Sequence, residues 1–111
     1  SGGWQLSPDG QYFAFGSWNN SVQVWDTVNG RKIASYPGHI GQVQVLAWSP
    51  DSRRIAIAGT DGTVQVWNVV TGKNIVRYQG LSQTASLTWS LDGKLIAATS
   101  ENNTVQVLQA T

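Results

Sequence analysis

The four-residue string Val-Gln-Val-Trp at residues 64–67 decides the fold, because it is one of three related copies in the chain. The same string occupies residues 22–25, and Val-Gln-Val-Leu occupies residues 105–108, which gives spacings of 42 and then 41 residues. A second motif keeps these offsets: Ser-Pro-Asp-Gly starts at residue 7, Ser-Pro-Asp-Ser at residue 49 and Ser-Leu-Asp-Gly at residue 90. Two motifs that recur in one register indicate diverged copies of a single structural unit.

Each copy has the composition of strands and tight turns. The apolar residues alternate or form short runs, and Gly, Asn, Asp, Ser and Pro bound these runs. We find no segment with the spacing of an amphipathic helix. The middle copy therefore predicts four strands, at residues 42–48, 54–59, 63–68 and 73–78.

The turn between the second and third strands of each copy carries its own signal. Asp61-Gly62 favours a type I′ hairpin, in which both central residues have positive φ. Asn19-Asn20 and Asn102-Asn103 occupy the equivalent positions, and Asn is the next most tolerant residue type there. The sequence thus predicts the same antiparallel hairpin three times.

Length and composition exclude several classes of protein. With 111 residues the chain has room for one ordinary domain. Seven Lys and Arg against six Asp and Glu give no clustered positive charge, which argues against a nucleic-acid partner. Without cysteine there is no disulfide, thiolate zinc site or cysteine nucleophile, and a single histidine excludes a multi-histidine metal site within one chain. We therefore expect no metal and no cofactor.

The chain also lacks the hydrophobic segments of membrane and secreted proteins. No run approaches about 18 consecutive apolar residues, and the first residues lack the basic and apolar regions of a secretory signal. These observations predict a soluble, cytoplasmic protein without a membrane partner.

The period and the motifs together resemble the WD-repeat family. Four antiparallel strands per 40–45 residues is the period of a propeller blade. Gly38-His39 resembles the Gly-His pair of that family, Trp25-Asp26 its Trp-Asp pair, and the Ser-Pro-Asp-Gly turns its first hairpin. The resemblance covers nearly the whole chain and implies an all-β fold of propeller blades within a single segment, 1–111. The first blade is expected at about 2–37, the second at about 42–79, and a partial third of three strands at about 84–109.

The resemblance also implies a buried hydrogen-bonded set of a His, a strand hydroxyl, a turn Asp and a Trp. Only the middle copy comes close, with His39, Asp61 and Trp67, while Ile57 stands at the hydroxyl position. His39 could instead be a catalytic base, since it is the only imidazole. We favour the structural role, because the family position and the turn partner both fit it.

The acidic residues of the repeated turns invite two interpretations. Asp9, Asp51 and Asp92 could form a ring of carboxylates that holds a cation. Each lies in a Ser-Pro-Asp or Ser-Leu-Asp turn, however, where Asp typically accepts backbone hydrogen bonds. We favour turn capping, and no acid–base pair or serine relay is evident. The chain is therefore expected not to be an enzyme.

The six tryptophans separate by their phase in the repeat. Four of them share two repeat positions and are expected in the core, namely Trp25, Trp67, Trp48 and Trp89. Trp4 aligns with Leu46 and Leu87, so it is expected to pack on an innermost strand. Trp18 lies beside a turn, and it is a candidate contact residue together with Arg53, Thr60 and Glu101.

Three blades are too few to close a ring, so we expect an open arc with two uncovered apolar faces. Either other copies of this chain cover them, two chains being favoured and three possible, or the chain is a fragment of a larger WD-repeat protein. The resemblance implies a non-catalytic scaffold that binds a protein or peptide. The alternative is a small-ligand propeller that binds a sugar through Trp18, and an enzyme ranks third.

Overall fold

The computed structural model describes residues 4–16, 21–36, 43–79 and 84–110, and these residues form three antiparallel β-sheets. The first sheet, blade 1, contains β1 (Trp4–Leu6), β2 (Tyr12–Gly16), β3 (Val22–Asp26) and β4 (Lys32–Tyr36). Blade 2 contains β5 (Val43–Trp48), β6 (Arg54–Gly59), β7 (Val64–Asn68) and β8 (Asn74–Tyr78). Blade 3 contains β9 (Thr84–Trp89), β10 (Leu95–Ser100) and β11 (Val105–Gln109). None of the described residues is helical, so the all-β expectation is confirmed.

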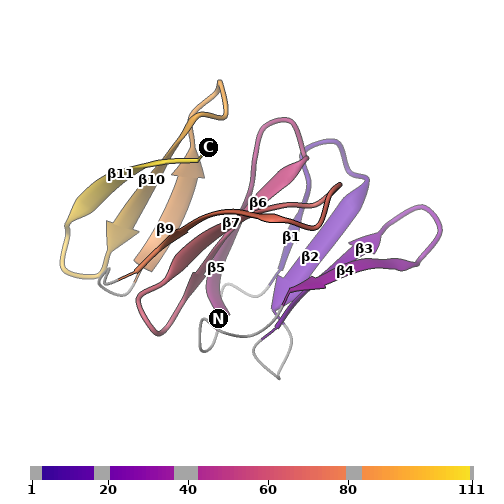
Figure 1. Ribbon diagram of the computed structural model, residues 1–111, viewed down its shortest axis with the longest axis horizontal. Helices are drawn as coiled ribbons and strands as arrows, with labels where there is room; N and C mark the ends of the chain where they lie inside the picture. The colour runs from indigo at the N-terminus through magenta and orange to yellow at the C-terminus, as the bar shows by residue number, and fades with distance from the viewer. Residues whose placement is uncertain (1–3, 17–20, 37–42, 80–83, 111) are drawn as a thin grey trace.

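The three blades lie side by side in chain order (Figure 1). Within each blade every strand pairs with the next strand along the chain, and β11 is the outer edge of blade 3. The innermost strands β1, β5 and β9 lie next to one another. The described part of the chain contains no helix long and apolar enough to cross a membrane. The arrangement is an arc of successive propeller blades with an open end on each side.

Two apolar layers hold the arc together, one between each pair of neighbouring blades. Ala14, Val22 and Val24 of blade 1 pack against Leu46 and Ile55 of blade 2. The second layer has the same composition at equivalent repeat positions, because Ala56, Val64 and Val66 of blade 2 pack against Leu87 and Ile96 of blade 3. Strand alternation therefore gives each blade two apolar faces, and the blades bury them by stacking.

Each repeated Ser-x-Asp turn is stabilised by hydrogen bonds between residues of the same turn. The three turns lie at residues 7–12, 49–54 and 90–95. In the first turn the Ser7 hydroxyl donates to the Asp9 carboxylate at 2.6 Å and accepts the N–H of Tyr12. The same carboxylate accepts the N–H of Gln11, and the other two turns repeat all three bonds. The aspartates thus cap turns, as the sequence predicts.

These hydrogen bonds also set the acidity of the turn aspartates. The Ser7 hydroxyl and then the Gln11 N–H hold the pKa of Asp9 below its usual value of 3.8. The pKa of Asp92 is lowered by the equivalent hydrogen bonds from its own turn. The second residue of each turn makes none of these bonds and faces solvent, and Leu91 in the third turn is 97% exposed.

A serine occupies a left-handed position in the middle turn. Ser52 has a φ of 61°, where the equivalent residues Gly10 and Gly93 have φ of 74° and 73°. A side chain is disfavoured in this conformation. The Ser52 hydroxyl accepts the N–H of Asp9 at 3.2 Å, which links the first turn to the second across the boundary between two blades.

In blades 2 and 3 the hairpin between the second and third strands differs from the type I′ turn that the sequence predicts, while the equivalent Asn19-Asn20 turn lies outside the described residues. Gly62 and Asn103 have positive φ, whereas Asp61 and Asn102 do not. The N–H of Gly59 donates to the carbonyl of Thr63, so three residues lie between the paired positions. This is a type I turn followed by a left-handed residue. The type I′ prediction is therefore wrong for blades 2 and 3, because Asp-Gly is compatible with both turn types and only the loop length distinguishes them.

Candidate interaction site

The boundaries between blades contain a repeated hydrogen bond that the sequence did not predict. The indole N–H of Trp48 in blade 2 donates to the backbone carbonyl of Gln5 in blade 1, at 3.1 Å. One repeat later, the indole N–H of Trp89 donates to the carbonyl of Ala47 at 2.9 Å. Each tryptophan therefore reaches back to the innermost strand of the preceding blade.

A residue at the start of the second strand covers each of these tryptophans. Tyr12 of blade 1 stacks on Trp48, with ring centroids 5.8 Å apart and 16° between the planes. Arg54 takes the equivalent position in blade 2, and its guanidinium carbon lies 4.9 Å from the ring centroid of Trp89. Arg54 also donates to the carbonyl of Gly93 at 2.8 Å, which ties blade 2 to blade 3. Each internal boundary thus combines an aromatic contact with a polar one.

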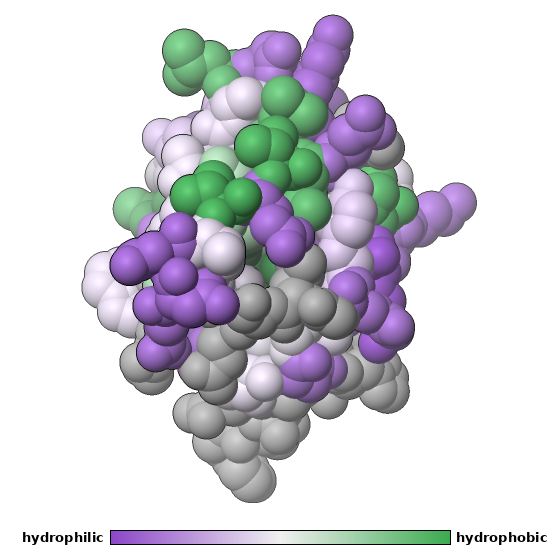
Figure 2. Space-filling model, turned by 90° about the vertical axis from the view of Figure 1, so that its left-hand side faces the viewer, coloured by the Kyte–Doolittle hydropathy of each residue, from purple (hydrophilic) through white to green (hydrophobic). Residues whose placement is uncertain are grey.

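Blade 3 presents an uncovered face that has the composition of a buried one. Val105 and Val107 of β11 are 62% and 64% exposed. Their equivalents Val64 and Val66 of blade 2 are both 0% exposed, because blade 3 covers them. Leu95 of β10 belongs to the same face and is also exposed. Figure 2 looks at this side of the molecule and shows hydrophobic side chains gathered between hydrophilic ones.

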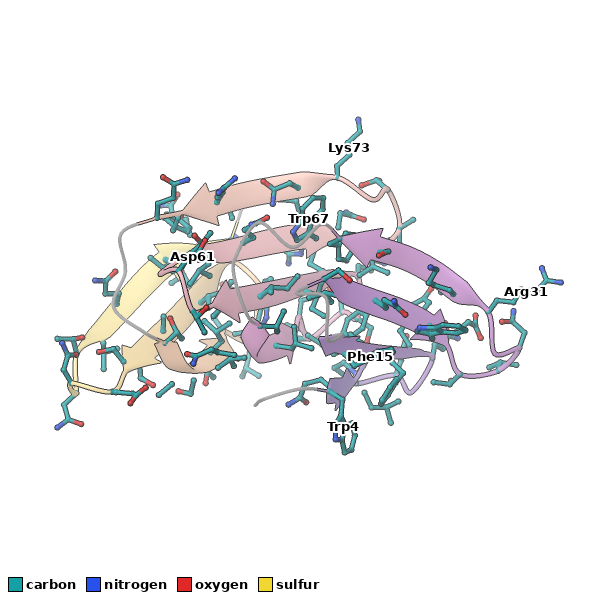
Figure 3. The ribbon with its side chains drawn as sticks, turned by 90° about the horizontal axis from the view of Figure 1, so that it is seen from below. Trp4, Phe15, Arg31, Asp61, Trp67 and Lys73 are labelled. Atoms are coloured by element: carbon teal, nitrogen blue, oxygen red, sulfur yellow. The ribbon has the colours of Figure 1, made fainter. Side chains whose placement is uncertain are left out.

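Blade 1 presents the second uncovered face, at the other end of the arc. Trp4 is 65% exposed, and Leu6 on the same strand is half exposed. Trp4 contacts Phe13, whose ring lies 5.6 Å away, and Phe13 in turn contacts Phe15. Figure 3 shows Trp4 and Phe15 on the same outer side of the first sheet. The prediction that Trp4 packs like Leu46 and Leu87 is wrong, because none of the described residues forms a blade in front of β1.

The other tryptophans differ in burial. Trp48 is buried, as predicted, while Trp25, Trp67 and Trp89 are half-buried. Trp67 stacks on Tyr36 of blade 1, with centroids 4.6 Å apart. The core prediction therefore holds for Trp48 and is wrong in degree for the other three.

The repeated tryptophan of the third strand has a hydrogen-bond partner on its own strand, while His39, a member of the expected set with Asp61 and Trp67, lies outside the described residues. The indole N–H of Trp67 donates to the side-chain carbonyl of Gln65 at 3.0 Å, and Trp25 donates to Gln23 at 3.1 Å. Alternate residues of a strand share a face, so the Val-Gln-Val-Trp string itself places Gln beside Trp. The Asp61 carboxylate accepts the N–H of Thr63 within its own turn.

Several residues singled out in the sequence lie outside the described residues, namely Trp18, the Asn19-Asn20 turn and the Gly38-His39 pair. The remaining contact candidates lie at two ends of the blades. Exposed Arg53 precedes β6, whereas Thr60 follows that strand. Exposed Glu101 is the equivalent of Thr60 in blade 3, so these two share one end and Arg53 belongs to the other. Figure 3 shows the same separation of charge, with Arg31 and Lys73 at the hairpin tips and Asp61 at the opposite end.

The innermost strands border a groove of about 410 Å³ near the Ser-x-Asp turns. Its lining is mainly apolar and includes Leu6, Pro8, Trp48, Pro50 and Trp89. Both indole N–H groups in this lining are already bonded to backbone carbonyls. Within residues 4–16, 21–36, 43–79 and 84–110, no group of three or more His, Cys, Asp or Glu residues could hold a metal ion.

Comparison with known proteins agrees with this architecture. The family model described as "WD domain, G-beta repeat" matches residues 3–26, 30–68 and 73–108. The chain is similar to the anaphase-promoting complex subunit cdc20 of Dictyostelium discoideum, with 38% identity over 45 residues, which is 40% of this chain and 9% of that protein. It is also similar to the U5 small nuclear ribonucleoprotein 40 kDa protein of Pongo abelii, with 45% identity over 42 residues, or 38% of this chain and 12% of that protein. Since the family model matches all three copies, the chain belongs to the WD-repeat family.

Proposed function

We propose that this chain is a non-catalytic scaffold for protein–protein interaction and that it completes a propeller by association of two copies. The matched family supports the coarse part of this proposal, because WD repeats generally serve as protein-interaction platforms. In the proposed assembly the open face of blade 3 in one copy packs on the open face of blade 1 in the other. Two arcs of three blades then give six blades, which lies within the usual range for closed propellers.

The observation that carries the proposal is the exposure of Val105 and Val107. The same repeat positions are fully buried in blade 2, so the β11 face has the side chains of an interface without a partner in one chain. Exposed apolar faces of this kind mark association surfaces in soluble proteins. Within the described residues, the alternating positions of β9, β10 and β11 on this face and of β1, β2 and β3 on the blade 1 face include no charged side chain, and Lys32 of β4 lies at the edge of the blade 1 face. Uncharged surfaces can be desolvated together at little cost.

The test is the mass of the purified chain in solution, by sedimentation equilibrium over a range of concentrations. We expect a reversible equilibrium between one and two chains. Val107→Glu should leave one chain, because it buries a charge in the contact. Val70→Glu is the matched control, since Val70 has nearly the same exposure, 67%, but lies at a hairpin tip outside both faces. A wild-type chain that stays single up to millimolar concentration would refute self-association.

The ends of the blades are the proposed binding surface for a protein or peptide partner. Arg53 at one end and Thr60 and Glu101 at the other lie on turns between strands, where side chains can vary without disturbing the blades. The relatives span far more sequence than their alignments to this chain, which cover about a tenth of each relative. What those proteins assemble with therefore does not identify a partner here.

A further inference from the structure

The internal boundaries predict the register of the boundary between two copies. Three repeat positions build each internal boundary: the tryptophan of an innermost strand, the carbonyl that it bonds, and the residue that covers it. Between blades 1 and 2 these are Trp48, the carbonyl of Gln5 and the ring of Tyr12. In the next boundary they are equivalent residues one repeat later, Trp89, Ala47 and Arg54.

The two open faces hold one half each of a third boundary of this kind. On blade 3, Thr88 is the repeat equivalent of Ala47 and provides the backbone carbonyl, while Leu95 is the equivalent of Arg54, the covering residue. Both Thr88 and Leu95 are exposed. On blade 1 the tryptophan position falls to Leu6, which is also exposed. The side chain of leucine has no hydrogen-bond donor, so the bond from a side chain to this carbonyl cannot form at this boundary. The covering residue has changed as well, from an aromatic or cationic side chain to an aliphatic one.

We infer that two copies meet with Leu6 of one packed on Leu95 of the other and with the carbonyl of Thr88 left without an indole donor. This inference rests on the proposed self-association and specifies its register. Leu6 replaces the tryptophan of the other boundaries, and Leu95 replaces the residue that covers it. Because both replacements are leucine, the contact between them is apolar on both sides. Phe13 and Phe15 of blade 1 occupy the repeat positions of Ile55 and Ile57 in blade 2. In the proposed register these two rings face the small side chains of blade 3, namely Ala97 and the valines of β11. Large side chains thus oppose small ones, as they do where Ile55 packs near Ala14.

The register makes a gain of affinity possible by a single substitution. Leu6→Trp would restore the donor that Trp48 and Trp89 supply, aimed at the carbonyl of Thr88. A net hydrogen bond of ordinary strength changes an equilibrium constant about fivefold. Because a closed ring of two copies has two identical boundaries, we expect the dissociation constant to fall about twenty-fivefold.

Two control variants separate this hydrogen bond from added hydrophobic area. Leu6→Phe adds an aromatic ring without an N–H, so it should tighten association less than Leu6→Trp does. Ile33→Trp places a new tryptophan on β4 of blade 1, and the described part of blade 3 has no fourth strand to meet it. It should leave the dissociation constant unchanged. Circular dichroism of each variant verifies that the strands are intact.

The decisive measurement is a double-mutant cycle with Leu6→Trp and Leu95→Tyr, read as dissociation constants by sedimentation equilibrium. The pair would reproduce the stack of Tyr12 on Trp48, so the double variant should bind more tightly than the product of the single effects predicts. If the wild-type chain associates but these effects multiply independently, the register is overturned while self-association stands. If the wild-type chain and all variants stay single, both proposals fail.

Discussion

Arg54 is the side chain whose removal should most weaken the contact between blades 2 and 3. Its guanidinium donates to the carbonyl of Gly93 at 2.8 Å and lies over the ring of Trp89. A longer contact, at 3.4 Å, reaches the carbonyl of buried Ala110. A hydrogen bond from a charged group contributes about 1.5–3 kcal/mol, and a half-exposed cation–π contact adds about 0.5–1 kcal/mol. We therefore expect Arg54→Ala to lower the free energy of unfolding by about 3 kcal/mol.

Urea denaturation, followed by tryptophan fluorescence, measures this loss. With a denaturant slope of about 2 kcal/mol per M, the midpoint should fall by about 1.5 M. Arg54→Lys keeps the charge but loses the planar geometry that reaches both the carbonyl and the ring, so it should fall between wild type and Arg54→Ala. Association itself shifts the midpoint, so all variants are compared at one low chain concentration.

The neighbouring arginine is the matched control. Arg53 is exposed, lies on the same turn and has no hydrogen bond from its side chain to any described residue. Arg53→Ala should change the free energy of unfolding by no more than about 0.5 kcal/mol. Equal losses for the two alanine variants, or a loss below about 1 kcal/mol for Arg54→Ala, would refute the role of Arg54 as a link between blades.

Three further predictions concern packing, a buried hydroxyl and acid. A Cβ added at Gly16 would lie 2.8 Å from the Cβ of Val43, so Gly16→Ala should lower the thermal midpoint at a cost of about 1–3 kcal/mol; an unchanged midpoint would contradict the close approach. The buried Tyr36 hydroxyl has no hydrogen-bond partner among the described residues, and burial raises its pKa to about 12. Tyr36→Phe should therefore match or exceed the wild-type midpoint in urea, and a clear loss would reveal a partner outside those residues. Since hydrogen bonds, first from Ser7, lower the pKa of Asp9 in the folded state, this group stabilises the fold above about pH 4 and loses that effect as pH falls through the folded pKa. Asp9→Asn should accordingly be less stable than wild type at pH 7, and urea midpoints over a pH series should show the difference narrowing as pH falls through the lowered pKa of Asp9.

The sequence predicts the strands and the self-capped turns well, because both depend on nearby residues. The recurrence of residues 22–25 and 64–67 places the third strand of two blades, and the turn at 49–54 contains every group that its side-chain hydrogen bonds require. Such local interactions depend on short motifs, and the recurrence of a motif in the next copy supports the prediction made from the first. The same reasoning predicts three strands for the third copy, and three strands form blade 3 within the described residues.

Burial and side-chain pairing were harder to predict, because they depend on neighbours in space. Trp4 aligns with buried Leu46, yet its exposure is decided by the absence of a covering blade. The hydrogen bond between Trp67 and Gln65 could have been predicted from their shared strand face. The side-chain rotamers that bring the indole N–H to the amide oxygen cannot be predicted from the sequence. The sequence places Arg53 and Glu101 in loops, and only the direction of the strands shows that these loops lie at opposite ends of the blades.

The self-contained hydrogen bonding of the Ser-x-Asp turns has a practical consequence. The serine and the aspartate make the side-chain hydrogen bonds of the turn, and the residue between them makes none of these bonds. In the third turn this residue is Leu91, whose side chain is almost fully exposed to solvent. That position is therefore a natural attachment point for a fluorophore or an affinity handle. A chemical label placed there would leave the hydrogen bonds of the turn intact.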